Sequence, residues 1–410
     1  MSRKKFLKNL TSLSVLQVVN YILPLLLIPF LVKKIGINNV GLIAVMTAIA
    51  AYFQLVIDYG FNLTATRDIA KFSDDNKKTS SITSAVINIK IMILAIIIII
   101  SIPAYYAIDY IKDNFLVYFF SVAMIVARSF FPVWHFQGIQ EMKYISISNV
   151  IPKVVFALLI FYFVRDEDDV WKVQFLYFAG TFVSLVLGSY FLKIKCNFKY
   201  CFQFDQIIFY IKDGFSIFLA KLVSGLYKNY NILALGFFAS PTLVGVYSIA
   251  EKAIRGIQML QNVVGDVLYP IFSKKSHQDK DFYKKTAKKY SFIIILVYGF
   301  SSLIIFMMSG FLSNLLSNVF NTEVKLAIEI MSLGFLFGGM NYLIAILGLT
   351  SNGYSNLYSK CIISTGFFNL IIATCLCYYY SYIGAAISLV LSELFLLLLL
   401  FVFAKKIKLL

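Results

Sequence analysis

A pattern of polar residues occurs twice in this chain, in two stretches that are otherwise apolar. The first stretch carries Thr47, Gln54, Asp58 and Asn62; the second, whose related positions lie 204 residues later, carries Glu251, Arg255, Gln258, Asn262 and Asp266. Steps of three and four residues place each set on one face of a helix. Because half of the 410-residue chain is 205, the repeat predicts a two-lobed membrane transporter with a water-filled central cavity.

Other charged residues also lie inside segments that should be buried in lipid. The bases are Lys90, Arg128, Lys153, Lys221, Lys228, Lys252 and Arg255, and the acids are Asp58, Glu251, Asp266 and Glu393. A charge at the centre of a bilayer costs about 2.5–3.5 kcal/mol, so these groups must pair, reach the interface or line water. The excess of bases predicts a cationic cavity whose charge complements an anionic group such as phosphate.

Lys221 and Lys228 form one helix face with Ser224 and Asn231, and this face contains no acid. One interpretation is the wall of a cationic cavity that awaits an anionic ligand. The alternative is structural: one lysine extends to the membrane interface and the other pairs with an acid of the next helix, Glu251 or Asp266.

The remaining charges also have two interpretations each. Glu251 and Arg255 stand four residues apart and can pair on one helix, while Asp58 and Asp266 could be solvated or capping residues. Glu393 could line the cavity or form a pair between two helices. From their positions in the predicted spans we expect Arg128 to line the cavity, Lys153 to line the cavity or reach the interface, and Lys90 to have a structural role.

The composition indicates an all-α, multi-pass membrane protein. Hydrophobic residues make up 60% of the chain and charged residues only 14%, which a soluble domain could not accommodate. Twelve apolar segments are long enough to cross a ~30 Å hydrocarbon core: 10–32, 40–64, 81–108, 114–138, 144–164, 170–192, 212–237, 242–270, 289–309, 325–348, 356–379 and 382–404. We expect two pseudo-symmetric six-helix lobes, 1–205 and 206–410.

The distribution of basic residues predicts the topology. With both termini in the cytoplasm, the cytoplasmic segments hold 24 basic residues and the opposite side holds 6, as the positive-inside rule requires. The net charge of +17 also suits contact with anionic membrane lipids. We expect no nucleic-acid partner, because no basic soluble domain is present.

The sequence contains no motif that is typical of an enzyme or of a metal site. The chain has five cysteines and two histidines without the spacing of a metal site, and no hydrolase or nucleotide-binding signature occurs. The sequence therefore predicts a protein that is not an enzyme and has neither a metal nor a cofactor.

Four segments carry a family resemblance. They read LVKKIGINNVGLIA (31–44), DYGFNLTATRDIAK (58–71), FFPVWHFQGIQEMKYISISN (130–149) and GVYSIAEKAIRG (245–256). They resemble the O-antigen flippases, which are polysaccharide transporters of the MOP superfamily. Arg67, Trp134 and Gln137 lie within these motifs. We expect Trp134 and Gln137 to contact sugar, although an anchor at the membrane interface would explain Trp134 equally well.

The resemblance implies a flippase of the bacterial inner membrane. Its cargo would be an oligosaccharide repeat unit on undecaprenyl pyrophosphate, moved from the cytoplasmic to the periplasmic leaflet by alternating access. A proton or sodium gradient is the expected energy source. Membrane lipids, a polysaccharide polymerase and a chain-length regulator are the expected partners.

Two other functions share parts of this pattern. A multidrug exporter of the same superfamily has the same architecture, but a cavity for cationic drugs should favour acids over bases. A membrane enzyme of polysaccharide assembly would typically carry a large periplasmic loop, whereas the longest expected outside loop here, around 310–324, has about 15 residues.

Overall fold

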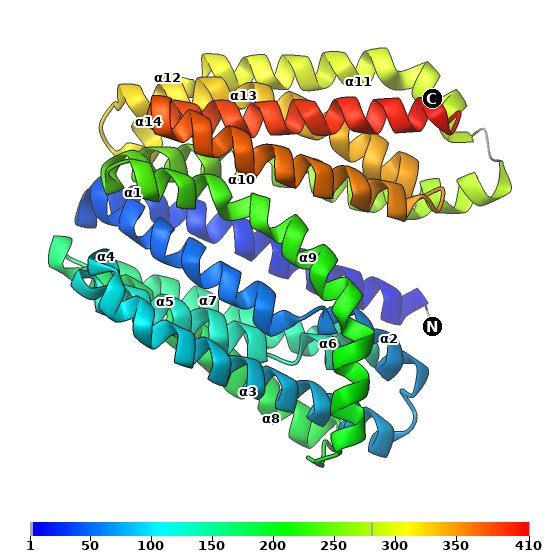
Figure 1. The fold of residues 1–410 in the computed structure, drawn as a ribbon. Coiled ribbons are helices and arrows are strands. Elements are labelled where there is room, and N and C mark those ends of the chain that lie inside the picture. Colours follow the sequence, from blue (N-terminus) through cyan, green and yellow to red (C-terminus); the bar gives the residue numbers. More distant parts are fainter. Residues whose placement is uncertain (1–2, 280–281, 410) are drawn as a thin grey trace. The chain divides into compact units, whose positions relative to one another are not determined.

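The computed structural model describes the backbone of residues 3–279 and 282–409 (Figure 1). Within this range the side chains of 3–10, 13, 21, 104, 216, 220, 223, 224, 226–228, 260, 262–264, 266, 267, 270, 271 and 277 lie outside the description. The described residues are almost all helical, and no strand occurs among them. The all-α prediction is therefore confirmed.

Fourteen α-helices, one 3₁₀ turn and one π-helical segment make up the described chain. Their bounds are α1 Arg3–Asp58, α2 Phe61–Lys71, α3 Asn76–Ala107, α4 Asp109–Asp113, α5 Phe115–Phe130, α6 Val133–Gly138, α7 Met142–Phe163, η1 Glu167–Asp169, α8 Val170–Lys195, α9 Phe204–Phe238, α10 Pro241–Gln278, α11 Phe282–Met307, α12 Ser309–Ser317, α13 Thr322–Tyr342, η2 Leu343–Thr350 and α14 Ser355–Lys406.

Eight helical stretches of the described chain are long and apolar enough to cross a membrane. Two of them are far longer than one crossing needs, because α1 has 56 residues and α14 has 52 whereas about 20 suffice. Each of these two contains one residue with non-helical dihedrals, Gly36 in α1 and Ser381 in α14. The multi-pass membrane fold is confirmed, and the count of twelve spans stays a prediction.

The chain reverses at Ser381, so α14 is two antiparallel segments (Figure 1). Ser392 donates a hydrogen bond to Asn369 at 2.8 Å, and the rings of Phe368 and Phe395 stack with centroids 4.3 Å apart. Both pairs join residues at nearly equal distances before and after Ser381, as a hairpin requires. This break falls between the predicted segments 356–379 and 382–404.

Two of the predicted segments are wrong at their ends. The segment 40–64 is interrupted where Tyr59 and Gly60 have φ of 43° and 91°. The segment 114–138 is interrupted at Phe131 and Pro132, because a proline disfavours helical dihedrals at the residue before it. Both breaks lie inside the family-like motifs and redirect the chain into the short helices α2 and α6.

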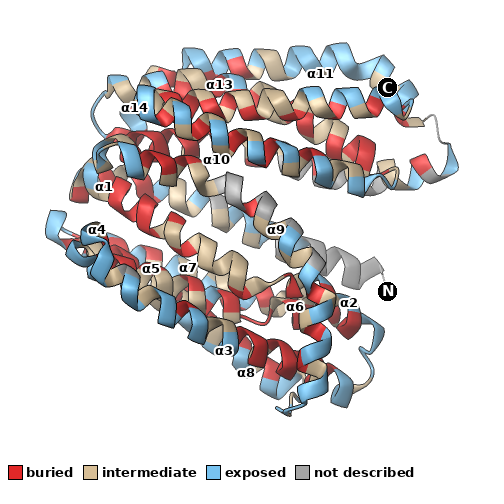
Figure 2. Ribbon diagram, in the orientation of Figure 1, coloured by how far each residue is buried: buried red, intermediate tan, exposed pale blue. Residues whose placement is uncertain are grey.

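The chain divides into two compact units. Unit 1 contains residues 1–27 and 46–225, and unit 2 contains 28–45 and 226–410. The lobe boundary expected at 205 stays a prediction. In unit 2, buried residues gather along α13, while α11 is mostly exposed (Figure 2). Phe292 and Phe300 on α11 are exposed by 71% and 66%, as expected of side chains that face lipid tails.

The two copies of the sequence repeat meet inside unit 2. A Cβ atom added to Gly41 would lie 1.8 Å from the carbonyl oxygen of Pro241, and one added to Gly245 would lie 2.2 Å from the carbonyl oxygen of Ile37. Pro241 is the repeat counterpart of Ile37, and Gly245 is the counterpart of Gly41. Such reciprocal contacts are the signature of a two-fold relation, and the glycines let the backbones approach closely.

We predict that Gly41→Ala destabilises the protein, because its methyl group has to displace the backbone of α10. The thermal unfolding midpoint of the purified protein in detergent should fall by several degrees, or no folded protein should be recovered. Gly299→Ala is the matched control: it lies in α11 with no atom within 4 Å of an added Cβ, and alanine is favoured over glycine in a helix by about 0.5–1 kcal/mol. Equal midpoints for the two variants would contradict the packing.

Candidate functional site

The family-like motif DYGFNLTATRDIAK (58–71) forms the junction between α1, α2 and α9. Gly60 has φ of 91°, which a residue with a side chain rarely adopts, and a Cβ there would lie 2.7 Å from Ile217 of α9. Tyr59 stacks on Phe218 at 4.6 Å and donates a hydrogen bond to the carbonyl of Ile211 at 3.2 Å. The motif therefore fixes the angle between α1 and α2 against α9, all within unit 1.

Among the described charged residues of unit 1, Lys90 is the most buried, with 0% exposure. Its ammonium group lies 3.0 Å from the carboxylate of Asp58 and donates to the carbonyl of Ser129 at 2.5 Å. It also stands over the ring of Trp134, 4.4 Å from the centroid. A buried charge is tolerated when it is paired and hydrogen-bonded, so Lys90 and Asp58 have structural partners in one another.

The family-like motif at 130–149 packs directly on the motif at 58–71. The carbonyl of Trp134 accepts a hydrogen bond from Thr66 at 3.2 Å, and a Cβ at Gly138 would lie 2.5 Å from Ile69 of α2. The Trp134 side chain is fully buried, so in this structure it is neither an interfacial anchor nor open to sugar. Gln137 is half-buried at the end of α6. The sugar contacts of both residues stay a prediction.

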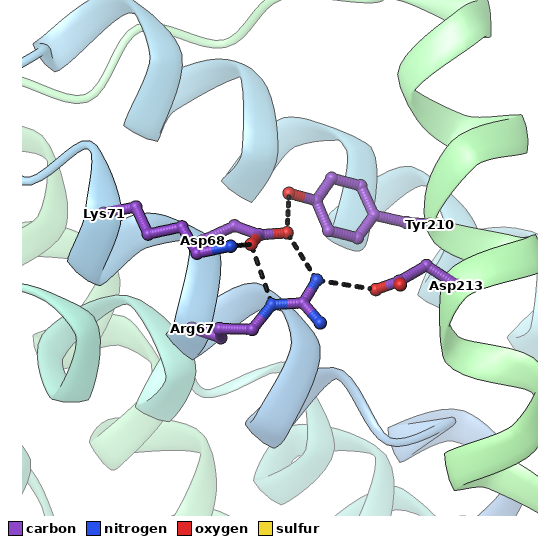
Figure 3. Close-up of polar contacts among 5 residues, drawn as sticks. All are labelled: Arg67, Asp68, Lys71, Tyr210 and Asp213. Carbon is purple, nitrogen blue, oxygen red and sulfur yellow. Dashed lines mark hydrogen bonds and ion pairs between the residues drawn. The ribbon is translucent and has the colours of Figure 1, made fainter.

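Arg67 joins α2 to α9 through a network of charges (Figure 3). Its guanidinium donates to Asp68 at 2.9 and 3.0 Å and to Asp213 at 3.0 Å. Tyr210 donates to Asp68 at 3.2 Å, and Lys71 lies 3.4 Å from the same carboxylate. This bidentate and bridging geometry uses the planar fork of arginine, which a lysine could not reproduce.

A cationic cavity of about 440 Å³ lies wholly within unit 1. Arg128 of α5 and Lys153 of α7 supply its charge, and Gln17, Asn20 and Asn149 supply amide groups. Lys153 donates to the side-chain oxygen of Asn20 at 2.5 Å. The lining also contains the hydroxyls of Tyr177 and Thr181 from α8. Two of the bases predicted for a cavity are therefore brought together in one.

The balance of charge in this cavity is unusual for a membrane interior. No carboxylate lines it, and among the described acids neither Arg128 nor Lys153 has an ion-pair partner. A cation without a counter-charge is costly in such a place, so the site favours an anion. Its amides and hydroxyls can accept and donate hydrogen bonds to sugar hydroxyls.

Unit 2 has a smaller polar cavity of about 130 Å³ that contains carboxylates. Glu251 of α10 pairs with Arg255 at 2.6 Å, and their side chains are 8% and 46% exposed. Glu393 of α14 accepts a hydrogen bond from Asn341 of α13 at 2.7 Å, and Gln258 completes this side of the lining. Glu393 thus lines the cavity and also makes a contact between helices.

A chain of amides closes the other side of this cavity. Asn231 of α9 donates to the hydroxyl of Tyr247 at 3.2 Å and accepts from Asn369 at 3.1 Å. Asn369 in turn accepts from Ser392 at 2.8 Å. These buried groups are satisfied by one another, which fixes α9, α10 and the two segments of α14 around the cavity.

The other predicted residues lie as follows. Thr47 accepts a hydrogen bond from Gln174 at 3.1 Å, and Gln54 donates to Asp58 at 3.4 Å, both within unit 1. Lys221, Lys252 and Asn62 are half-buried. The side chains of Ser224, Lys228, Asn262 and Asp266 lie outside the described residues, so the acid-free face of α9 stays a prediction beyond Lys221 and Asn231.

Sequence reasoning missed the uncharged members of these sites. Gln17, Asn20 and Asn149 were not singled out, and neither were Asn341 and Asn369. Each of these residues is an amide within an apolar segment. An amide indicates a polar cavity less strongly than a charge does, because it costs less free energy to bury. Asp213 and Tyr210 carried no signal, because their partner Arg67 is distant in sequence.

The chain matches known families over most of its length. The family model described as "Polysaccharide biosynthesis protein" matches residues 6–276. A protein of Escherichia coli (strain K12) named "Putative O-antigen transporter" is 30% identical over 409 residues, which cover 98% of this chain and 97% of that protein. A protein of the same name from Shigella dysenteriae is 25% identical and covers 95% of this chain and 98% of its own.

Two solved structures share the fold. An inward-facing multidrug resistance MATE transporter of the MOP superfamily aligns with a TM-score of 0.67 at 12% identity, over 93% of this chain and 98% of its own. The lipid II flippase MurJ in an inward closed conformation aligns with a TM-score of 0.60 at 16% identity, over 90% and 86%. At these identities the likeness concerns the fold alone.

We predict that Asp58 and Lys90 are energetically coupled. Asp58→Asn or Lys90→Met alone should destabilise the protein strongly, because removing one member of a buried pair typically costs about 3–5 kcal/mol. The double variant should recover much of that loss in thermal unfolding of the purified protein. The exposed pair Asp75–Lys78, 3.8 Å apart, is the control, and Asp75→Asn or Lys78→Met should cost less than about 1 kcal/mol. Additive effects at Asp58 and Lys90 would refute the coupling.

Proposed function

Because this chain belongs to the family of polysaccharide biosynthesis proteins, we propose that it is a flippase that moves a lipid-linked oligosaccharide across the membrane. The O-antigen transporters to which it is similar over nearly its full length support a transporter rather than an enzyme. The fold shared with a lipid II flippase is consistent with a lipid-linked cargo.

The observation that carries this proposal is the acid-free cavity of Arg128 and Lys153. A sugar chain on a diphosphate cannot cross ~30 Å of hydrocarbon unaided, since its hydroxyls and charges would lose water without replacement. Two cations can replace the hydration of the phosphates, and the amides of Gln17, Asn20 and Asn149 can bond to sugar hydroxyls. The lipid tail can stay in the bilayer while the head passes.

The cargo we propose is an O-antigen-type repeat unit on undecaprenyl pyrophosphate, moved from the cytoplasmic to the periplasmic leaflet of the bacterial inner membrane. Alternating access would expose the cargo in this cavity to each side of the membrane in turn. A polysaccharide polymerase and a chain-length regulator would then act on the product.

We further propose that the carboxylates of unit 2 couple transport to a proton or sodium gradient. Glu251 and Glu393 line one cavity with Gln258 and Asn231, and oxygen ligands of this kind suit either cation. Asp58 is a weaker candidate because Lys90 already neutralises it. Lys221 and Lys228 stay candidates for a separate cationic face of α9, because their spacing places them on one side of that helix.

A multidrug exporter is the competing function, because the MATE transporter shares the fold. The contents of the unit 1 cavity argue against it. Arg128 and Lys153 would repel a cationic drug, and no carboxylate in that cavity could attract one.

We predict that Arg128→Glu and Lys153→Glu each abolish surface polysaccharide in a flippase-null strain complemented with this chain. One lost charge-assisted hydrogen bond is worth about 1.5–3 kcal/mol, which is about tenfold to a hundredfold in binding, and the reversed charge adds repulsion. Arg128→Lys should be milder, since it keeps the charge.

The control for this experiment is Lys112→Glu, an equal change of charge at an exposed residue of α4 outside the cavity. It should leave polysaccharide unchanged at equal protein level. Wild-type polysaccharide from Arg128→Glu and Lys153→Glu would rule out the cationic cavity as the site of transport.

We predict that both termini and the segment around 274–289 face the cytoplasm. The basis is the excess of basic residues on that side. A reporter that is active only in the cytoplasm should work when fused after residue 279, and a reporter that is active only in the periplasm should work after residue 317. The opposite pattern would invert the topology.

A further inference from the structure

A second basic cleft lies in unit 1, apart from the cavity of Arg128 and Lys153. It has a volume of about 500 Å³ and forms where the end of α2, the start of α3 and the start of α9 meet. Lys71, Lys77 and Lys78 line it together with the amides of Gln203 and Gln206. The predicted topology places this end at the cytoplasmic surface of the membrane.

The one carboxylate that lines this cleft is already neutralised. Asp68 is held by two hydrogen bonds from Arg67, at 2.9 and 3.0 Å, and by one from Tyr210 at 3.2 Å (Figure 3). Lys71 is 3.4 Å from Asp68, yet its side chain remains 61% exposed. Arg67 and Lys71 together balance Asp68 and Asp213, and the exposed ammonium group of Lys71 can still reach a ligand in the cleft.

The nearby acid Asp75 leaves the other two lysines available as well. One oxygen of Asp75 caps α3 by accepting from the backbone N–H groups of Lys77 and Lys78, each at 3.1 Å. The Lys78 ammonium lies 3.8 Å from the other oxygen, and its side chain is 58% exposed. The Lys77 side chain makes no ion pair with any acid that the structure describes. The cleft therefore carries a net positive charge.

Exposed aromatic rings surround these lysines. Phe72 and Phe209 line the cleft and are 39% and 51% exposed, and Phe202 and Phe204 on the adjoining segment are 65% and 62% exposed. Lysines that alternate with exposed apolar rings are typical of a surface at the boundary between headgroups and acyl chains. A soluble anion would contact the lysines alone, whereas a lipid would contact the lysines with its headgroup and the rings with its acyl chains.

We propose that this cleft binds the phosphate headgroup of an anionic lipid, with Lys71, Lys77 and Lys78 as its ligands. The amides of Gln203 and Gln206 donate further hydrogen bonds to the phosphate, and the lipid chains lie against Phe72 and Phe209. The cleft is separate from the cavity of Arg128 and Lys153 that we propose for transport. The lipid also bridges α2–α3 and α9, the elements that Arg67 and Asp213 connect.

The test is lipid binding to the purified full-length chain in detergent, measured by native mass spectrometry. The probes are phosphatidylglycerol, undecaprenyl diphosphate and, as a zwitterionic control, phosphatidylcholine. Near a membrane surface each lysine contributes about 1 kcal/mol to binding of an anionic lipid, or about fivefold. Lys77→Gln should therefore weaken binding about fivefold, and the triple variant Lys71→Gln/Lys77→Gln/Lys78→Gln by tenfold or more.

The matched control is Lys193→Gln/Lys195→Gln/Lys199→Gln, which removes three exposed lysines of unit 1 outside the cleft. Loss of phosphatidylglycerol binding in the cleft variants alone supports the site and identifies a membrane phospholipid as its ligand. Loss of undecaprenyl diphosphate binding alone supports the site with a cargo-type lipid. Equal losses in both triple variants, or none in either, would overturn the assignment. Lys77→Gln, which breaks no described ion pair, keeps the test valid if a triple variant misfolds.

Discussion

The cost of placing charge in hydrocarbon governs this structure. A charged group inside the membrane must be paired or must line a polar cavity. Some of the described charges are paired, and others line a cavity. Lys90 has Asp58, and Glu251 has Arg255. Arg128 and Lys153 have no acid beside them and instead line a cavity with amides. The paired charges thus hold helices together, whereas the two without an acid define the place where an anion is favoured.

The cavities of the two units contain different charged groups. The cavity of unit 1 contains cations and amides, while that of unit 2 contains two carboxylates, one arginine and a chain of amides. An anionic cargo and a coupling cation would then have separate sites, each with the charge that suits it. Asn149 of the motif 130–149 and Glu251 and Arg255 of the motif 245–256 belong to these linings, but the most specific parts of the family-like motifs do not. DYGFNLTATR and the P-x-W-x-F-Q-G segment instead form the junction of α1, α2, α6 and α9, where Gly60, Trp134 and Gly138 are closely packed.

The sequence predicted the all-α membrane fold because apolar segments of about 20 residues have few other structures available. The sequence repeat corresponds to a contact in the structure, since Gly41 and Gly245 each pack closely against the other copy of the repeat. The partner of each charge was harder to predict. The pair Glu251–Arg255 follows from helix geometry, but Asp58 and Lys90 are 32 residues apart and only tertiary packing joins them. The helix break at Tyr59 was missed because the hydropathy of the sequence does not change there.

We propose that the cavity of Arg128 and Lys153 receives the head of the lipid-linked oligosaccharide. A photo-crosslinking amino acid at Asn149, which lines this cavity, tests it directly in membranes that make the cargo. Ile151 is the control, because it lies two residues further along α7, about 200° around the helix, and is 56% exposed. We predict that the lipid-linked oligosaccharide is crosslinked far more from position 149 than from position 151. Equal attachment from both positions, or attachment from 151 alone, would contradict it.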